Sequence, residues 1–429
     1  MNQLIKDNNH IFSKINYFLI LILPISIIAG SLISNINIIL ICLIFIFDLF
    51  QRKDFFLLKD KNFYFLIFIY IYLILNSLFV SQNVESITRA VGFIRFIFLA
   101  YSIFFYFKIY KNDFLKYWMI IFIIVSFDIL YEYIFGFNTI GFSSTYPGRI
   151  ASFTGDELKI GGFYFGFFAM VLIYIFRKNK FYFYFSAIFF LIIASAIGEK
   201  SNFLKILISF LFLVYFFLDK KNIIRILSIL ILSTSVILIV NIVQDLRESF
   251  LGELPLIKQS RVILHTIYPK PFTVADIKEN KNFKDHIVST RYFAHYSTAF
   301  EMVKKSPIFG VGLKNFPLEC QKEDYINEDF LFHSVRCSTH PHQLHLDILT
   351  SLGFVGYLLL MISILYLILK NCLIFLKQKN LFTLSGTIFL ISTLLIPVPS
   401  GSFFTSYGAT ILWINIGILL AYEKYSYEN

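Results

Sequence analysis

Three histidines in a short stretch are the side chains of this chain best suited to chemistry. His340, His342 and His345 lie within residues 338–347, directly before a long apolar run. A neutral imidazole can take a proton from a hydroxyl group, so one of these rings could act as a general base. Two alternatives stay open: polar residues at a membrane surface, and a metal site facing the pair His342/His345. No cysteine or carboxylate follows at zinc-like spacing, which argues against the metal.

The residues around His342 predict how its ring is held. Thr339 is a candidate N-cap, and Pro341 suits the first turn of a helix. We therefore expect His342 in the first helical turn, where the partial positive charge of the helix N-terminus disfavours imidazolium. A ring that stays neutral is what a general base requires. Further along, Gly353 and Gly356 predict a close approach by another helix.

The elements that must position these residues are membrane spans. Of 429 residues, 57% are hydrophobic and only 15% are charged, and the mean hydropathy is +0.72. Many apolar runs reach about 17–25 residues, the length that crosses a bilayer. This composition excludes a soluble globular enzyme, a secreted disulfide scaffold and a disordered chain. We predict an all-α polytopic membrane protein.

Hydropathy predicts about twelve transmembrane helices, with one large outside loop before the tenth, which would be a periplasmic loop in a bacterial inner-membrane protein. The expected spans are residues 15–33, 36–50, 63–80, 87–107, 117–137, 161–176, 181–197, 203–218, 226–243, 344–369, 381–397 and 407–422. They divide the chain into spans one to nine at 1–243, the large loop at 244–343, and spans ten to twelve at 344–429. A smaller outside loop covers residues 138–160.

The net charge of +11 follows this topology. Lysines and arginines cluster in every second gap between apolar runs, and the alternate gaps are nearly free of them, which is the positive-inside pattern. The pattern places both chain ends in the cytoplasm and the large loop outside. The charge is therefore mainly a topology signal, and it argues against nucleic-acid binding. The expected surroundings are membrane lipids.

Two of the four cysteines lie in the large outside loop. Cys320 and Cys337 are placed to form a disulfide in an oxidising compartment, although two unpaired thiols would also fit their spacing. Such a bridge would stabilise the fold by about 3 kcal/mol in the chain-entropy model. Cys42 and Cys372 lie in or beside apolar runs, where a free thiol behaves as a small apolar side chain.

Two segments of the chain have glycines at fixed spacing. One reads His342-Gln343, nine residues, Gly353, two residues and Gly356, and the other, residues 306–316, reads Ser-Pro-Ile-Phe-Gly-Val-Gly-Leu-Lys-Asn-Phe. Both resemble segments of the bacterial O-antigen ligases and their polymerase relatives. The first fits the family's His-Asn/Ser/Gln signature without a gap, and the second is similar to the family's Pro-x-x-Gly-x-Gly-x-x-x-Phe segment. The expected spans and the position of the large loop agree with the family too. An O-antigen ligase-related region would then cover about residues 185–365.

The resemblance implies a metal-independent, inverting glycosyltransferase of the GT-C type without a cofactor. Its donor would be a glycan on undecaprenyl pyrophosphate, and its acceptor a hydroxyl of lipid A–core or another molecule at the periplasmic face of the bacterial inner membrane. His342 matches the family histidine and would accept the hydroxyl proton. Arg291 opens a helix-like stretch, 291–305, where the family places a loop arginine, and would bind the pyrophosphate. The outside loops hold no Asp-x-Asp triplet for a divalent ion.

Further basic side chains are candidate contacts for the pyrophosphate or the acceptor, together with His340. Lys200 lies in an outside turn where ligase-like relatives often have arginine, and lysine supplies the charge without bidentate geometry. Arg149 resembles part of a family segment after the fifth span, although an ion pair within its own loop would explain it equally well. Arg95 lies in the fourth span, where an arginine faces a cavity or a phosphate by default. For the neighbouring Arg89, snorkelling to the interface is favoured.

Motifs do not distinguish the acceptors. A lipopolysaccharide ligase, a polysaccharide polymerase and a protein O-oligosaccharyltransferase would share the donor, the base and the pyrophosphate site. A flippase for lipid-linked sugars is the non-enzymatic alternative. Transporters tend to have repeated halves and charged midplane sites, whereas this chain gathers its histidines in and beside an outside loop. We therefore favour the transferase, and among transferases an O-antigen ligase of lipopolysaccharide biosynthesis.

Overall fold

The computed structural model describes residues 11–110, 113–146, 148–157, 159–217, 291–325, 335–378, 380–394 and 397–425. These residues form helices, turns and loops, with no strand among them. The helices before the large loop are α2 (Ile11–Leu21), α3 (Leu23–Ile28), α4 (Ser31–Arg52), α5 (Lys61–Asn76), α6 (Val84–Gly92), α7 (Ile94–Tyr110), α8 (Asp113–Phe135), α9 (Ile160–Lys178), α10 (Lys180–Ala196) and α11 (Lys200–Phe217). Those after it are α16 (Arg291–Lys305), α17 (Phe316–Glu319), α18 (Leu344–Gln378), α19 (Leu381–Leu394) and α20 (Ser406–Tyr425).

Seven helical stretches in this part of the chain are long and apolar enough to cross a membrane. They cover residues 31–52, 61–81, 84–110, 114–135, 160–178, 200–217 and 344–378. Shorter apolar helices, α2, α10 and α19, accompany them. The predicted all-α, multi-pass membrane architecture is therefore confirmed. The count of twelve stays a prediction, since the ninth span, 226–243, lies outside the described residues.

The first predicted span, 15–33, is wrong as a single helix. The chain there forms α2 and α3 and then turns at Gly30, whose φ is +115°. Pro24 lies at the start of α3, where its missing N–H leaves no helical hydrogen bond unmade. The tenth span is longer than predicted, because α18 continues to Gln378. The other predicted spans within the described ranges coincide with helices, the fourth with α6 and α7 together.

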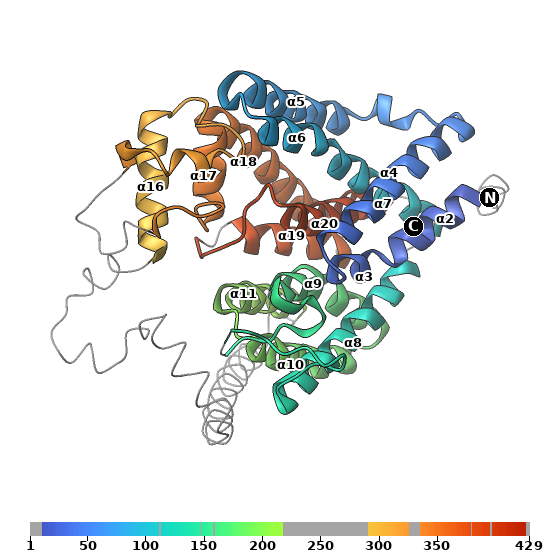
Figure 1. Cartoon of the computed structure of the whole chain (residues 1–429). Helices are drawn as coiled ribbons and strands as arrows, with labels where there is room; N and C mark the ends of the chain where they lie inside the picture. Colours follow the sequence, from blue (N-terminus) through green and yellow to red (C-terminus); the bar gives the residue numbers. More distant parts are fainter. Residues whose placement is uncertain are drawn as a thin grey trace, which may run out of the picture.

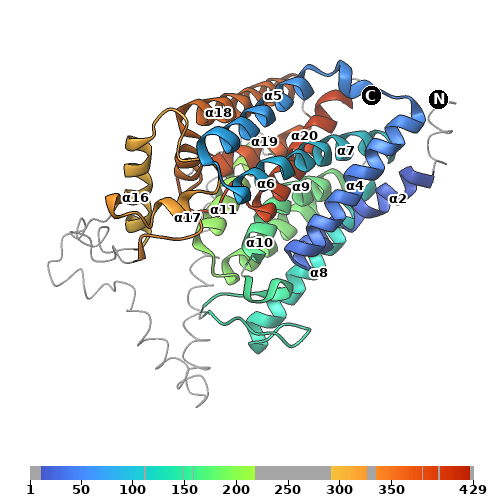
Figure 2. The same ribbon diagram turned by 45° about the horizontal axis from the view of Figure 1, so that its top comes forward.

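The centre of the bundle is the pair α7 and α20, with α9 and α19 packed against α20 (Figure 2). Gly417 lets α7 and α20 approach closely, since a Cβ atom there would lie 2.8 Å from the Ala100 carbonyl oxygen. Asn415 donates a hydrogen bond to the Gly166 carbonyl on α9 (3.1 Å). Small residues and interhelical hydrogen bonds of this kind stabilise helix packing in a membrane. There the hydrophobic effect does not drive helices together, because the lipid is as apolar as the side chains.

The two ends of the bundle differ. The helix α2 and the end of α20 lie at one end, and α16 and α17 lie at the other (Figure 1). Near the first end, Arg52 pairs with the buried Asp48 (2.9 Å), and Lys370 pairs with Glu423. Burying charged groups requires such partners. The histidine segment, which precedes α18 and contacts α16, therefore lies away from both described chain ends.

The long helix α18 is broken at Gly353, whose φ is +64° and ψ −171°. Residues 307–312 run alongside the break. Gly310, with φ +71°, lies directly against Gly353. A Cβ atom at Gly310 would lie 2.6 Å from the Gly353 nitrogen, and one at Gly353 would lie 2.5 Å from the Gly310 nitrogen. The two segments that resemble the family signatures thus meet backbone to backbone.

Hydrogen bonds to the segment 307–312 replace those that the helix loses. The carbonyl groups of Thr350 and Ser351 accept from the N–H groups of Val311 (2.7 Å) and Gly312 (3.0 Å). In return, the N–H groups of 354 and 355 donate to the carbonyl groups of 307 (2.7 Å) and 308 (3.2 Å). Unpaired backbone groups are costly in or near a membrane. The break is therefore stable only while this segment is docked.

The helix α5 completes the junction. The Tyr72 hydroxyl donates to the Leu352 carbonyl (2.7 Å), and a Cβ atom at Gly356 would lie 2.7 Å from the Tyr72 ring. The predicted close approach of a helix is thus found at Gly356. At Gly353 it is wrong, because the neighbour there is an irregular segment rather than a helix.

We expect Gly353→Ala to destabilise the protein by at least about 2 kcal/mol, because it forces a positive φ on alanine and overlaps the Gly310 backbone. Gly310→Ala should do the same. Thermal unfolding of the detergent-purified protein, followed by tryptophan fluorescence, measures the effect. Gly401→Ala is the control, since nothing lies within 4 Å of a Cβ atom there. Equal melting temperatures for all three variants would contradict the account of the junction.

Candidate active site

His342 lies just ahead of α18 rather than in its first turn. The helix begins at Leu344, and the Gln343 side chain caps it by accepting a hydrogen bond from the Leu346 N–H (2.7 Å). The predicted cap at Thr339 and the predicted helical position of His342 are therefore wrong. His342 has a φ of +57°, a left-handed conformation that costs a residue other than glycine on the order of 1 kcal/mol.

The loop between α19 and α20 holds the histidine segment in this conformation. The Ser400 N–H donates to the His342 carbonyl (2.9 Å). Two residues later, the Ser402 hydroxyl (2.7 Å) and the Phe403 N–H (2.9 Å) donate to the buried carboxylate of Asp347 in α18. Asp347 was not among the residues predicted from the sequence. Its available signal was a carboxylate inside an apolar run, which rarely faces lipid.

Hydrogen bonds separate the three histidines of the sequence motif into two kinds. In His340, Nε2 donates to the Ser400 carbonyl (3.3 Å) and Nδ1 accepts from the Thr339 hydroxyl (2.9 Å). In His345, Nε2 donates to the Leu394 carbonyl (2.7 Å) and Nδ1 lies 3.1 Å from the Tyr357 hydroxyl. Both rings therefore have their two nitrogens engaged by protein groups. Among the described residues, the His342 ring nitrogens have no hydrogen-bond partner, so this ring is the one available to a substrate.

The helix α16 lies beside the His342 ring. It begins at Arg291 and ends at Lys305, the limits expected from the sequence. The Tyr292 ring lies 6.0 Å from the His342 ring, and the His295 ring lies 5.2 Å from it. Arg291 therefore starts the helix one residue before a direct neighbour of His342. The structure does not describe the Arg291 side chain, so its contact with a pyrophosphate stays a prediction.

The surroundings of the histidines favour neutral rings. Burial lowers the pKa of His342, and the neighbouring His295 lowers it further. Burial and the proximity of His342 lower the pKa of His340 to about 3. The pKa of His342 is shifted in the direction that favours a neutral imidazole, but the cause differs from the expected one. Desolvation and a neighbouring histidine keep His342 neutral, rather than a position in the first turn of a helix.

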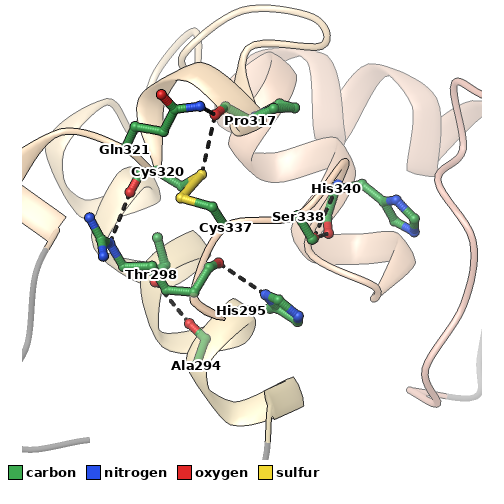
Figure 3. The surroundings of a disulfide bond; sticks show 10 residues. Ala294, His295, Thr298, Pro317, Cys320, Gln321, Cys337, Ser338 and His340 are labelled. Atoms are coloured by element: carbon green, nitrogen blue, oxygen red, sulfur yellow. Dashed lines mark hydrogen bonds between the residues drawn. A yellow bond between two sulfur atoms is a disulfide. The ribbon is translucent and has the colours of Figure 1, made fainter. Parts of the chain in front are cut away.

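A disulfide fixes the chain just before the histidines. Cys320, at the end of α17, is bonded to Cys337, and their Cα atoms are 5.4 Å apart. Between these anchors, Arg336 donates from Nε to the Cys320 carbonyl (2.9 Å) and accepts at its own carbonyl from Nδ1 of His295 (2.9 Å). Figure 3 shows these contacts, with His340 beyond Ser338 on the far side of Cys337. The bridge therefore joins α17, α16 and the histidine segment.

Arg149 and Lys200 are brought close to each other by two docked loops. The Ile150 N–H donates to the Ile197 carbonyl (3.1 Å), and both basic side chains are exposed. Glu199 precedes Lys200 in the chain, and burial raises its pKa while the charge of Arg149 opposes that rise. Within the described residues, no hydrogen bond or ion pair joins Arg149 or Lys200 to the histidine segment.

Arg95 lies at the junction of α4, α7 and α20. Its guanidinium group donates to the Gly92 carbonyl, to Ser406 and to Asn35. All of these partners are neutral, and the part of the chain that the structure describes offers Arg95 no carboxylate within ion-pair distance. Its Nε atom is buried without a partner there. Ser406 follows the loop that holds His340 and His342, so Arg95 lies beside the same loop.

Part of the chain matches the model of a known protein family. Residues 185–361 match the family model described as O-antigen ligase. The chain carries an O-antigen ligase domain. This confirms the resemblance seen in the sequence, and the O-antigen ligase domain includes α16, the disulfide, the docked glycine segments and the histidines 295, 340, 342 and 345. No curated protein matches the chain.

We expect Cys320→Ser to lower the stability of the protein by about 3 kcal/mol, because the bridge closes a loop with a sequence separation of 17. Non-reducing mass spectrometry should recover the peptides of Cys320 and Cys337 as one cross-linked species. Cys372→Ser is the control, since that thiol is free. Recovery of both loop cysteines as free thiols in protein from the native membrane would refute the bridge.

Proposed function

We propose that the protein is a membrane glycosyltransferase that moves a glycan from undecaprenyl pyrophosphate to an acceptor hydroxyl on the periplasmic side. We favour an O-antigen ligase. One observation carries the proposal: within an O-antigen ligase domain, His342 presents a half-buried neutral ring whose nitrogens the described protein groups leave open. The neighbouring His340 and His345 rings are instead hydrogen-bonded to the Ser400 and Leu394 carbonyls.

The proposed reaction involves one proton transfer and the departure of one leaving group. The acceptor hydroxyl oxygen attacks the anomeric carbon of the first donor sugar, and its proton passes to His342. The bond between that carbon and the pyrophosphate oxygen breaks on the opposite face, so the configuration inverts. Undecaprenyl pyrophosphate leaves with the bonding electrons, and cationic groups stabilise the added charge.

Arg291 is the proposed principal cation for this leaving group, because α16 starts beside the His342 ring. Arg95 is proposed to bind a phosphate nearby, since a half-buried arginine with only neutral hydrogen-bond partners in the described protein gains much from an anion. Arg149 and Lys200 are proposed as further contacts for the glycan or the pyrophosphate. We propose that these cations replace a divalent ion, so chelation with EDTA should leave the activity unchanged.

An apolar groove of about 320 Å³ supports a lipid-linked donor. It lies between α5, α7, α18 and α20, and its lining includes Leu66, Ile97, Leu360, Trp413 and Phe403. Phe403 also bonds Asp347 through its N–H, so the groove adjoins the loop that holds the histidines. A polyprenyl chain in this groove would bring its pyrophosphate to the level of Arg95.

The test is transfer by the purified protein in detergent, with a lipid-linked glycan donor and lipid A–core as acceptor. A flippase cannot produce a glycosylated acceptor when there is no membrane to cross. Transfer to lipid A–core identifies a ligase, and extension of the donor glycan alone identifies a polymerase. Transfer to a protein hydroxyl identifies the protein O-oligosaccharyltransferase alternative.

We expect His342→Ala to reduce the rate of transfer by about 10²- to 10⁴-fold, the usual loss with a general base. Its melting temperature should stay close to that of the wild type, because only the backbone of His342 is bonded to the protein in the described region. His345→Gln is the matched control for removal of a nearby imidazole. A well-folded His342→Ala variant with a near wild-type rate would refute the proposed base.

We expect the acid limb of kcat/KM against pH to lie below about 6.5, the usual pKa of histidine. The base acts only when neutral, its neutral form prevails above its pKa, and burial and His295 lower that pKa. His295→Ala should therefore shift the limb towards higher pH. Rates measured between pH 4.5 and about 8 test this, and a wild-type limb above pH 7 would contradict it.

A further inference from the structure

Lys314 is held in a backbone conformation that a lysine rarely adopts. The Asn315 N–H donates to the Gly312 carbonyl (3.2 Å), which closes a tight turn with Lys314 at φ +62°. Glycine is the residue that suits this position without strain. A costly conformation of this kind persists where the surrounding structure enforces it, and such residues cluster at functional sites.

The turn is clamped from two sides. On one side, the Gly312 N–H donates to the Ser351 carbonyl in α18 (3.0 Å). On the other, Asn315 donates to the Ser81 carbonyl (3.4 Å), and Asn83, at the start of α6, donates to the Asn315 side chain (3.2 Å). The position of Lys314 is therefore fixed relative to both α6 and α18.

The side chains of this turn differ in their surroundings. Leu313 is 1% exposed and Phe316 is 2% exposed, so both belong to the protein interior. Lys314 is half-buried, and among the described residues its ammonium group makes no hydrogen bond or ion pair. Removing an ammonium group from water without a partner is costly.

Several charged groups surround Lys314. Burial lowers its pKa, the positive charge of Arg89 lowers it further, and Asp347 and Glu85 oppose the shift. The ammonium group is also near enough to contribute to the low pKa of His340. Asp347 already accepts two hydrogen bonds at one oxygen, from Ser402 and Phe403. Two cations therefore share this region, next to the histidine segment.

We propose that Lys314, with Arg89, binds a phosphate group of the lipid-linked donor and stays bound to it as the pyrophosphate leaves. A phosphate between the two cations removes their mutual repulsion and supplies the acceptor atoms that the ammonium group lacks. Arg89 is free to take part, because its side chain is 41% exposed and its Glu85 partner lies 4.0 Å away at the surface. This inference rests on the proposed transferase function and adds a donor-binding residue to it.

The experiment compares Lys314→Gln, Lys314→Arg and Lys314→Gly in the full-length protein. The probe is inorganic pyrophosphate, whose binding is measured by calorimetry without turnover. Inhibition of glycan transfer by the same probe is measured in parallel. Lys314→Gln should weaken pyrophosphate binding about 10- to 100-fold and raise the KM for the donor, as expected for loss of a charged hydrogen bond. Lys314→Arg should retain part of the affinity, since it keeps the charge.

Lys314→Gly separates binding from a purely structural role. Glycine suits φ +62°, so the melting temperature should not fall, while pyrophosphate binding falls as in Lys314→Gln. Lys305→Gln is the control, because that exposed lysine pairs with Asp324 (3.1 Å). If Lys314 only balances the charge of Asp347, Lys314→Gln and Lys314→Gly will have lower melting temperatures than the wild type and will bind pyrophosphate like the wild type. That result would overturn the inference.

The two proposals can fail separately. A wild-type protein that transfers glycan, with Lys314→Gln showing unchanged pyrophosphate affinity and donor KM, refutes the role of Lys314 alone. A wild-type protein that binds pyrophosphate through Lys314 but produces no glycosylated acceptor refutes the transferase and leaves the anion site. A wild-type protein that does not bind pyrophosphate refutes the anion site.

Discussion

The region around the histidines depends on one backbone-to-backbone contact, between Gly310 and Gly353. Neither position has room for a Cβ atom, and each has a positive φ. The contact converts a helix break, which would leave five backbone groups of α18 unpaired, into a junction where residues 307–312 and Tyr72 satisfy them all. Residues 307–312 and the helix α18 are thereby joined by backbone hydrogen bonds in both directions.

The consequences of this junction extend in both directions along the chain. Towards the N-terminal side, it positions α16, whose Tyr292 and His295 flank His342. Towards the C-terminal side, it sets the first turns of α18, where Asp347 receives the loop that also bonds His340 through Ser400. The candidate base is held by its backbone and by its neighbours, while its ring stays open. Such preorganisation by surrounding groups is what a reactive side chain needs.

The sequence predicted those parts that local chemistry decides. Hydropathy located most of the helices, and the limits of α16 and the choice of His342 as candidate base came from patterns within short windows. It failed where distant segments compete with local preference. Thr339 looked like a cap, but its hydroxyl bonds the His340 ring and Gln343 caps α18 instead. The sequence around Lys314 did not predict a functional role for it. Its environment includes contacts between segments more than two hundred residues apart, and no local sequence pattern predicts such contacts.

The order of elements along the chain gives the Gly353 break a meaning for biogenesis. Tyr72 and residues 307–312 all precede it, so every partner of the broken turn has been synthesised before α18 arrives. The partners of His340 and Asp347 lie in the loop before α20 and come last. A nascent chain halted after α18 could therefore close the glycine junction, yet its histidine segment would lack its hydrogen-bond partners until the loop between α19 and α20 has been synthesised.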